Sequence, residues 1–531
     1  MNFLKILLLN LLFISFSIAS NFQTDSSALS TKSFKEKEQV LENLLENYKE
    51  DEKLDVLLQN MLAGDLYFIK ATNELVILET KEDNNYFVKN LITDESLSAM
   101  DKNELSKVKI NNKLRGVIKS GLAKINLFSK KTDKRLKAAK NILANLELED
   151  KELLAQALQS EKNSSVRDIL LESDANLKAK FSTGTEQLEA VKLLGGFLSS
   201  KSLETLNYVV SNSESEELKE VANESLKEIE NSKWFYSLIE TAFFGLSQGS
   251  VLLLAAIGLA ITFGVMKVIN MAHGELIMIG AYTTYTIQQL MPNLIEYSII
   301  IAIPAAFIVS GIVGILIERL VIRHLYGRPL ETLLATFGVS LILQQLVRSI
   351  YSPLNQEVKT PSWMSGALEV NSSLFLTYNR LYIIIFGIVV FLSVLYVMKK
   401  TSLGLKVRAV SQNRPIARAM GIKSSYIDAA TFGIGSGIAG VAGVALSQLT
   451  NVGPNLGQAY IVDSFMVVVF GGVGNLWGTL IAAFSLGEIN KFIEPLAGAV
   501  LAKVIILVFI ILFIQKKPRG LFPQKGRDAE D

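Results

Sequence analysis

Cysteine is missing from this 531-residue sequence, and histidine is almost missing. Without cysteine the chain forms no disulfides and offers no thiolate to a metal, whatever its redox compartment. His273 and His324 are the two histidines, too few for a histidine-rich metal cluster. The sequence also lacks a G-x-x-x-x-G-K-[ST] loop, so any ATP that drives this protein must bind to another chain. We therefore expect a protein without a catalytic site or cofactor of its own.

Charged residues are distributed unevenly along the chain. Half of all residues are hydrophobic and the net charge is +2, but Lys, Glu, Asp, Asn and Ser crowd the sequence up to about Lys233. From Trp234 onward, runs of Leu, Ile, Val, Ala, Gly and Phe are broken by short polar connections. This change in composition predicts a soluble domain, residues 20–233, followed by a membrane domain, residues 234–531.

The first residues have the pattern of a signal peptide, residues 1–19. Lys5 supplies the positive charge, residues 6–18 form an apolar core, and Ser17-Ile18-Ala19 offers small residues for cleavage. An apolar core this short does not span a bilayer comfortably, although an uncleaved anchor helix remains the alternative. A cleaved signal peptide would place the soluble domain outside the cytoplasm.

The soluble domain is predicted to be mostly helical with a small β element. Residues 66–88 contain β-branched and aromatic residues around two Asn-containing turns, which favours a strand pair. From Thr132 onward there is a weak repeat of 52 residues. Its first copy contains Leu136, Ala138, Ile142, Leu146, Val166 and Ile169, and its second Leu188, Ala190, Leu194, Leu198, Leu218 and Val221. The repeat predicts a HEAT-like solenoid, and an ordinary helical bundle is the alternative.

The membrane domain contains nine apolar segments, which predict about nine spans. They lie near 238–265, 271–290, 298–321, 331–350, 381–398, 426–447, 461–477, 479–493 and 498–514. Lys and Arg are concentrated at 319–328, at 401–421 and from Lys516 onward. With nine spans these clusters share one side of the membrane, which the positive-inside rule makes cytoplasmic. The C-terminus is then cytoplasmic and the soluble domain extracytoplasmic.

Polar side chains inside or at the edge of these spans are the candidates for a translocation pathway. They are Gln248, Asn270, His273, Glu275, Glu488 and Asn490. A polar group in hydrocarbon costs free energy unless it faces a partner or a wet cavity, so such positions point to function. The structural alternative is hydrogen bonding between helices or a location at the headgroup level.

The 401–421 connection, TSLGLKVRAVSQNRPIARAMG, is basic and patterned. Small and apolar residues alternate with arginines, as expected of a short amphipathic helix that docks onto a partner. Two other motifs fail on context. Residues 435–440 match G-x-G-x-x-G and residues 245–249 match G-x-S-x-G, but both lie within predicted spans and lack the strand that these motifs need.

Residues 238–527 resemble the permeases of the ABC uptake systems for branched-chain amino acids and urea. The resemblance rests on GLSQGSVLLLAAIGLAITFGVMKVINMAHGELIMIGAY, with its N-x-A-H-G-E segment, on RAVSQNRPIARAMGI, and on VVVFGGVGNLWGTLIAA with the tail KPRGLFPQKGR. The second segment is similar to the coupling motif of ABC importers and keeps its Ala-x-x-x-Gly spacing. Pro415 and Ile416 depart from the Glu-Ala that begins the general motif.

Residues 60–230 look like the secreted extension of urea-system permeases, including a V-x-x-N-N-x-L-R segment. The resemblance thus implies a permease subunit of a urea importer in a bacterial cytoplasmic (inner) membrane. A branched-chain amino-acid permease is the alternative, and a passive urea or amide channel a more distant one. The implied partners are a second homologous permease, two ABC ATPase subunits, an extracytoplasmic binding protein and membrane lipid, but no nucleic acid. The implied ATPase contacts are Arg408, Asn413, Arg414, Ala417 and Gly421.

Overall fold

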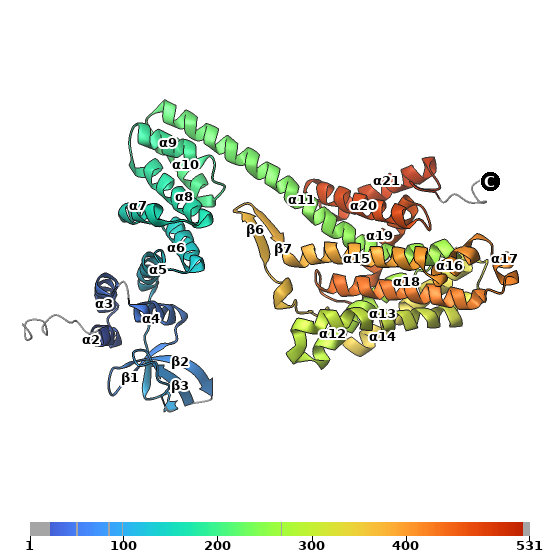
Figure 1. Cartoon of the computed structure of the whole chain (residues 1–531), viewed down its shortest axis with the longest axis horizontal. Helices are drawn as coiled ribbons and strands as arrows, with labels where there is room; N and C mark the ends of the chain where they lie inside the picture. The colour runs from blue at the N-terminus through green and yellow to red at the C-terminus, as the bar shows by residue number, and fades with distance from the viewer. Residues whose placement is uncertain (1–21, 49–50, 83–84, 98, 267, 524–531) are drawn as a thin grey trace, which may run out of the picture. The chain divides into compact units, whose positions relative to one another are not determined.

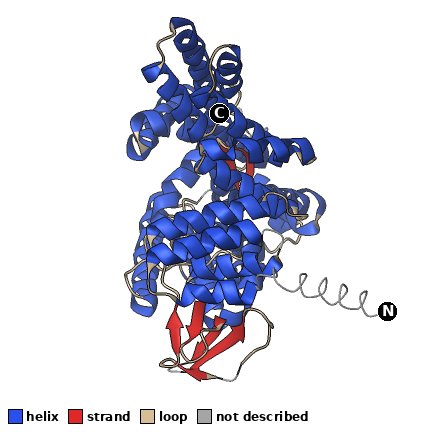
Figure 2. Cartoon of the chain, turned by 90° about the vertical axis from the view of Figure 1, so that its left-hand side faces the viewer, coloured by secondary structure: helices blue, strands red, loops and turns tan. Residues whose placement is uncertain are grey.

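The computed structural model describes residues 22–48, 51–82, 85–97, 99–266 and 268–523 (Figure 1). The predicted signal peptide, residues 1–19, lies outside the described residues. The chain divides into two compact units, residues 1–232 and 233–531. Helices dominate both units, and the named strands form one five-stranded sheet and one hairpin (Figure 2).

The first unit begins with helices and an antiparallel sheet. Helices α2 (Phe22–Ser27), α3 (Phe34–Asn47) and α4 (Glu52–Ala63) precede a sheet of order β4-β3-β2-β1-β5. Its strands are β1 (Leu66–Ile69), β2 (Leu75–Glu82), β3 (Asn85–Asn90), β4 (Met100–Asp101) and β5 (Leu105–Lys107). The sheet is larger than the expected strand pair, because two turns in 66–88 connect three strands and residues 100–107 add one at each edge. Val76, Val88 and Leu105 share a small buried core beneath it.

Six helices follow the sheet, and a seventh begins in this unit. They are α5 (Asn112–Asn126), α6 (Thr132–Ala144), α7 (Lys151–Ser160), α8 (Ser164–Phe181), α9 (Thr185–Leu194), α10 (Ser200–Asn212) and α11 (Glu216–Met266). The two copies of the repeat contribute to two successive cores. Ala138 and Val166 pack in the first core, and their counterparts Ala190 and Leu218 pack in the second. The solenoid interpretation stays a prediction.

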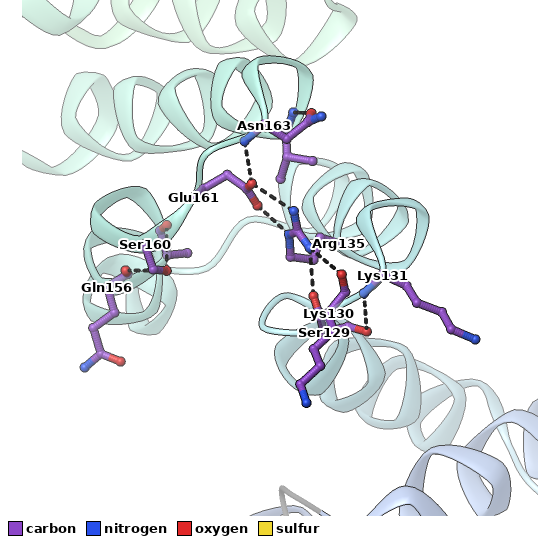
Figure 3. Close-up of polar contacts among 10 residues, drawn as sticks. Ser129, Lys130, Lys131, Arg135, Gln156, Ser160, Glu161 and Asn163 are labelled. Atoms are coloured by element: carbon purple, nitrogen blue, oxygen red, sulfur yellow. Dashed lines mark hydrogen bonds and ion pairs between the residues drawn. The ribbon is translucent and has the colours of Figure 1, made fainter.

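A buried ion pair fixes the turn between α7 and α8 against α6 (Figure 3). Arg135 donates from Nε and Nη2 to the two carboxylate oxygens of Glu161, over 2.7 and 3.1 Å. Its Nη1 donates to the Ser129 carbonyl, and the Asn163 amide donates to Glu161. The hydrogen bonds from Arg135 lower the pKa of the Glu161 carboxyl, whose side chain is 4% exposed. The carboxylate is therefore ionised wherever the fold is intact at neutral pH.

Within its described residues, the second unit contains nine long helices, counting α11. The others are α12 (His273–Leu290), α13 (Ile295–Leu320), α14 (Pro329–Tyr351), α15 (Tyr378–Lys400), α18 (Ser424–Ser447), α19 (Leu456–Gly471), α20 (Leu476–Ala497) and α21 (Ala499–Lys516). The strands β6 (Ala367–Asn371) and β7 (Leu374–Thr377) form a hairpin before α15. Short helices α16 (Ser402–Gln412) and α17 (Arg414–Ala419) lie between α15 and α18.

Each predicted span coincides with one of these helices, but the helices differ in apolar length. Among the described residues, six are long and apolar enough to cross a membrane: α11, α13 with its flanking turns, α14, α15, α18 and α21. Of the other three, α19 has 16 residues, and α12 and α20 carry charged and polar side chains. The architecture agrees with a polytopic membrane protein, and the count of nine spans stays a prediction.

Helix α18 forms the centre of the second unit and is buried along nearly its full length. It packs against α12 and α13, with glycines at the crossings. A Cβ atom on Gly280 of α12 would collide with the Gly440 carbonyl, and one on Gly443 would collide with the Ile277 carbonyl. Glycine is therefore required where these backbones touch. This packing places α12 directly against α18 inside the unit.

Candidate functional site

The segment before and at the start of α12 buries three of the predicted polar residues. His273 is fully buried, and its Nε2 lies 3.0 Å from the Ala255 carbonyl of α11. Its Nδ1 has no partner in the described part of the chain. The histidine thus joins α12 to α11 and retains a nitrogen that can still form a hydrogen bond.

Glu275 is the most unusual side chain of this segment. It is 1% exposed, and its Oε1 accepts hydrogen bonds from Ser340 Oγ at 2.9 Å and Gln344 Nε2 at 2.7 Å, both on α14. Its Oε2 meets no donor among the residues that the structure describes. A buried carboxyl with an unsatisfied oxygen is costly, so a ligand, a water or a proton must satisfy it.

Asn270 completes this group. It is 1% exposed, its Oδ1 accepts from the Ala272 amide at 3.0 Å, and its Nδ2 is unsatisfied within the described ranges. The neighbouring Met271 amide donates to Thr336 Oγ1 at 3.1 Å, which adds another link to α14. We call Asn270, His273, Glu275 and Gln344 the polar cluster. It offers both hydrogen-bond donors and acceptors inside an otherwise apolar helix bundle.

The other three predicted pathway residues form a second group on α11 and α20. Glu488 lies directly over Gly245, where a Cβ atom would collide with its carboxylate. Gln248 is half-buried with an unsatisfied Oε1, as far as the described residues go. Asn490 is buried and lines a small cavity. The six predicted residues therefore fall in two parts of the second unit, three at or just before the start of α12 and three on α11 and α20.

Sequence reasoning missed an ion pair beside Asn490. Lys503 of α21 lies 2.9 Å from Asp463 of α19, and the Asp463 side chain is 11% exposed. Both residues line the same small cavity as Asn490. An acidic residue in one apolar segment and a basic residue in another were the signal that could have revealed it, since charges inside spans pair with one another.

The basic connection was predicted as one short amphipathic helix, and the structure divides it at Asn413 into two, α16 and α17. Asn413 caps α17, because its Oδ1 accepts from the Ile416 amide at 3.0 Å. Ala417 is 4% exposed and packs with Val407 and Val410. Gly421 has a φ of +83°, a conformation that favours glycine. These three residues therefore help to determine the conformation of the segment.

Arg414 forms an internal ion pair. Its Nη1 and Nη2 donate to the two oxygens of Asp428 on α18, over 2.7 and 2.9 Å, and the Asp428 side chain is 1% exposed. Its guanidinium lies 4.8 Å from the centroid of the Tyr326 ring. Burial raises the pKa of the Tyr326 phenol, which stays neutral beneath the cation. The sequence signal for Asp428 was a single acid near the start of an apolar segment.

The side chains that the 401–421 segment leaves exposed are both apolar and polar, the polar ones including Lys406, Gln412 and Arg418. Leu405 is 62% exposed, Ile416 59% and Met420 79%. Arg408, in contrast, donates to the Met398 carbonyl at the end of α15. The surface that this segment offers to a partner is therefore mixed, and two of its arginines, Arg408 and Arg414, also form contacts within the chain.

Comparison with known proteins identifies the second unit. Residues 241–514, just over half of the chain, match the family described as the branched-chain amino acid transport system / permease component. The high-affinity branched-chain amino acid permease BraD of Pseudomonas aeruginosa is 28% identical over 54% of this chain and 96% of its own length. Its counterpart LivH of Escherichia coli is 29% identical over 55% and 97%.

A more distant relative is the ribose import permease RbsC of Escherichia coli, 25% identical over 52% of this chain and 87% of its own length. No solved structure matches the chain. These relatives are named as transport permeases, and each is matched over most of its length. The chain belongs to the branched-chain amino acid transport system permease family.

Proposed function

We propose that this chain is a membrane-spanning permease subunit of an ATP-driven importer and that its cargo is a branched-chain amino acid. The observation that carries the proposal is the family match over residues 241–514, together with relatives named for this cargo that align over almost their entire length. This cargo replaces urea as the leading candidate, because the matched relatives are named for amino acids.

The polar cluster suits such a cargo. An amino acid carries an ammonium and a carboxylate, and each requires compensation inside a membrane domain. The free Oε2 of Glu275 can accept from an ammonium, and the free Nδ2 of Asn270 can donate to a carboxylate. The cluster also lies at the start of α12, where backbone amides favour an anion. The six pathway residues predicted from sequence remain candidates within this scheme.

Transport by this mechanism requires other chains. We propose two ABC ATPase subunits, a second homologous permease and an extracytoplasmic binding protein as partners, in the inner membrane of a bacterium. The ATPases dock on α16 and α17, and their ATP-driven closure moves this segment and switches the spans between two states. The predicted contacts are Arg408, Asn413, Arg414, Ala417 and Gly421. The C-terminus is then cytoplasmic and residues 20–233 are extracytoplasmic.

Urea is the second candidate cargo, and the first unit is the observation that favours it. The family match begins at residue 241, so this unit lies outside it. Residues 60–230 resemble the extension of urea-system permeases. Urea is neutral and both donates and accepts hydrogen bonds, so it needs no counter-charge from Glu275.

Uptake of labelled leucine and labelled urea, measured in parallel in cells with and without this gene, tests the proposal. Loss of leucine uptake alone supports it, whereas loss of urea uptake alone overturns the cargo but keeps the importer. Uptake that persists when ATP is depleted contradicts ATP-driven transport and indicates a passive channel. Glu275→Gln should reduce leucine uptake by about tenfold or more, because it removes a charge-assisted contact. Exposed Glu357 supplies the matched control, Glu357→Gln.

A further inference from the structure

A cavity of about 240 Å³ opens where α16 leaves the helix bundle. Its walls come from α11, α15, α16, the start of α20 and the turn before it. Neither the polar cluster nor the pair of Asp463 and Lys503 lines it. We call it the interface cavity. It is separate from every residue proposed for the translocation pathway.

The interface cavity has an apolar side and a cationic side. Ile261, Leu395 and Leu476 supply apolar wall. Lys399 and Arg408, both exposed, supply two positive charges at its edge. No acidic side chain is among its lining residues. This combination is complementary to an anion that carries a hydrocarbon chain.

The position of the cavity along the helices corresponds to the headgroup layer of a membrane. Lys399 and Lys400 end the apolar helix α15. Trp477 lines the cavity, is 47% exposed, and packs edge-on against Phe391 with ring centroids 5.4 Å apart. Lysine and tryptophan at the ends of spans are typical of the membrane–water interface.

From this geometry we propose that the interface cavity binds the headgroup of an anionic phospholipid. The phosphate pairs with Lys399 and Arg408. Asn475 Nδ2, which donates one N–H to the Phe522 carbonyl, has a second N–H to offer the phosphate. Arg408 already donates to the Met398 carbonyl, but a guanidinium has five N–H donors, so others remain for the phosphate. A volume equivalent to about eight water molecules accommodates the headgroup and the first methylenes rather than a whole lipid.

A lipid in this position contacts α15 and α16 together. Lys399 is in the last turn of α15 and Arg408 is in α16, so one phosphate bridges the two helices across the Thr401 connection. The bound lipid thereby ties the segment proposed to couple to the ATPase to the membrane helices. This role rests on the cavity itself and does not depend on which cargo the protein carries.

The test compares the purified full chain in nanodiscs of phosphatidylcholine with and without phosphatidylglycerol. Native mass spectrometry measures how much phosphatidylglycerol remains bound when the protein is released. Each cation contributes about 1 kcal/mol near a membrane surface, so Lys399→Gln and Arg408→Gln should each lower occupancy roughly fivefold. Lys406→Gln is the matched control, because Lys406 is an exposed lysine of α16 that does not line the cavity.

Three outcomes overturn the proposal: no preference for phosphatidylglycerol, equal losses in Lys399→Gln and Lys406→Gln, or unchanged binding in both cavity variants. If Arg408→Gln fails to fold because its backbone contact is lost, Lys399→Gln still decides the question. Ser411→Trp gives an independent check, since it obstructs the cavity edge without removing a charge. This variant should also reduce retained phosphatidylglycerol while leaving phosphatidylcholine unaffected.

Discussion

The ion pair between Arg414 and Asp428 predicts how firmly α17 is held to the membrane helices. Asp428→Asn removes one charge and leaves the Arg414 guanidinium facing an amide. Removing one partner of a buried pair costs about 3–5 kcal/mol. Since the Arg414 side chain is 25% exposed and partly solvated, we take the lower end, about 3 kcal/mol. The docked state of α17 should therefore weaken about 150-fold relative to the undocked state.

Hydrogen exchange of the α17 amides in the full chain, in nanodiscs, measures this change. Exchange at these amides should accelerate strongly in Asp428→Asn, up to the factor given above. Arg418→Gln is the matched control, because in the described part of the chain Arg418 makes one hydrogen bond, from Nε to Ser424 Oγ over 2.8 Å. Its loss should cost about 1 kcal/mol, which is roughly fivefold.

A double variant distinguishes the loss of the pair from general damage. Arg414→Gln combined with Asp428→Asn leaves no buried unpaired charge, so it should recover part of the protection that either single variant loses. Additive losses in the double variant would refute the reasoning. So would an exchange rate in Asp428→Asn no faster than in Arg418→Gln. In the assembled importer, the same variant should lower the substrate transported per ATP hydrolysed.

Two further predictions concern stability. Gly280→Val should abolish the folded membrane domain, since its side chain would collide with the α18 backbone. Gly338→Ala should be tolerated, because a Cβ atom there meets nothing within 4 Å. Fluorescence-detected gel filtration of the two proteins checks this difference. Glu161→Gln should destabilise the first unit by about 2 kcal/mol at neutral pH. Because folding lowers the pKa of Glu161, the wild-type protein has the larger free energy of unfolding above the carboxyl's unfolded pKa. This difference from Glu161→Gln is lost as the pH falls through the lower folded pKa. The rates of limited proteolysis of the wild-type and Glu161→Gln proteins should therefore differ at neutral pH and become equal at acidic pH.

Sequence patterns located the membrane helices well because apolar runs of this length have few other uses. Each predicted span coincides with a helix of the structure, and the polar run around His273 was visible as an interruption. The sequence did not reveal which residues form hydrogen bonds with these polar groups. Ser340 and Gln344 hydrogen-bond to Glu275 from 65 and 69 residues away, and such pairings depend on how helices pack rather than on local pattern.

In the first unit too, the sequence predicted buried positions better than it predicted pairing partners. The 52-residue spacing placed Ala138 and Ala190 in buried cores, because apolar periodicity reports burial directly. The sequence predicted too few strands for the sheet, since β4 and β5 have two and three residues and carry no alternating pattern of their own. Their strand geometry comes from pairing with β3 and β1. Short edge strands are generally specified by the partner strand and not by their own sequence.

The arginines of α16 and α17 show that a charge pattern does not identify the partner of each cation. Arginines beside apolar residues predicted cations that face a partner, yet Arg414 pairs with Asp428 and Arg408 reaches the Met398 carbonyl. A buried pair contributes position more than affinity, because desolvation offsets most of its Coulomb energy. We infer that the arginines orient α16 and α17, while exposed Ile416 and Met420 supply the apolar surface on which an ATPase docks. Met420→Asp should then disrupt that docking, since it places a charge in the apolar contact, and a pull-down of the ATPase with the wild-type and Met420→Asp proteins checks this.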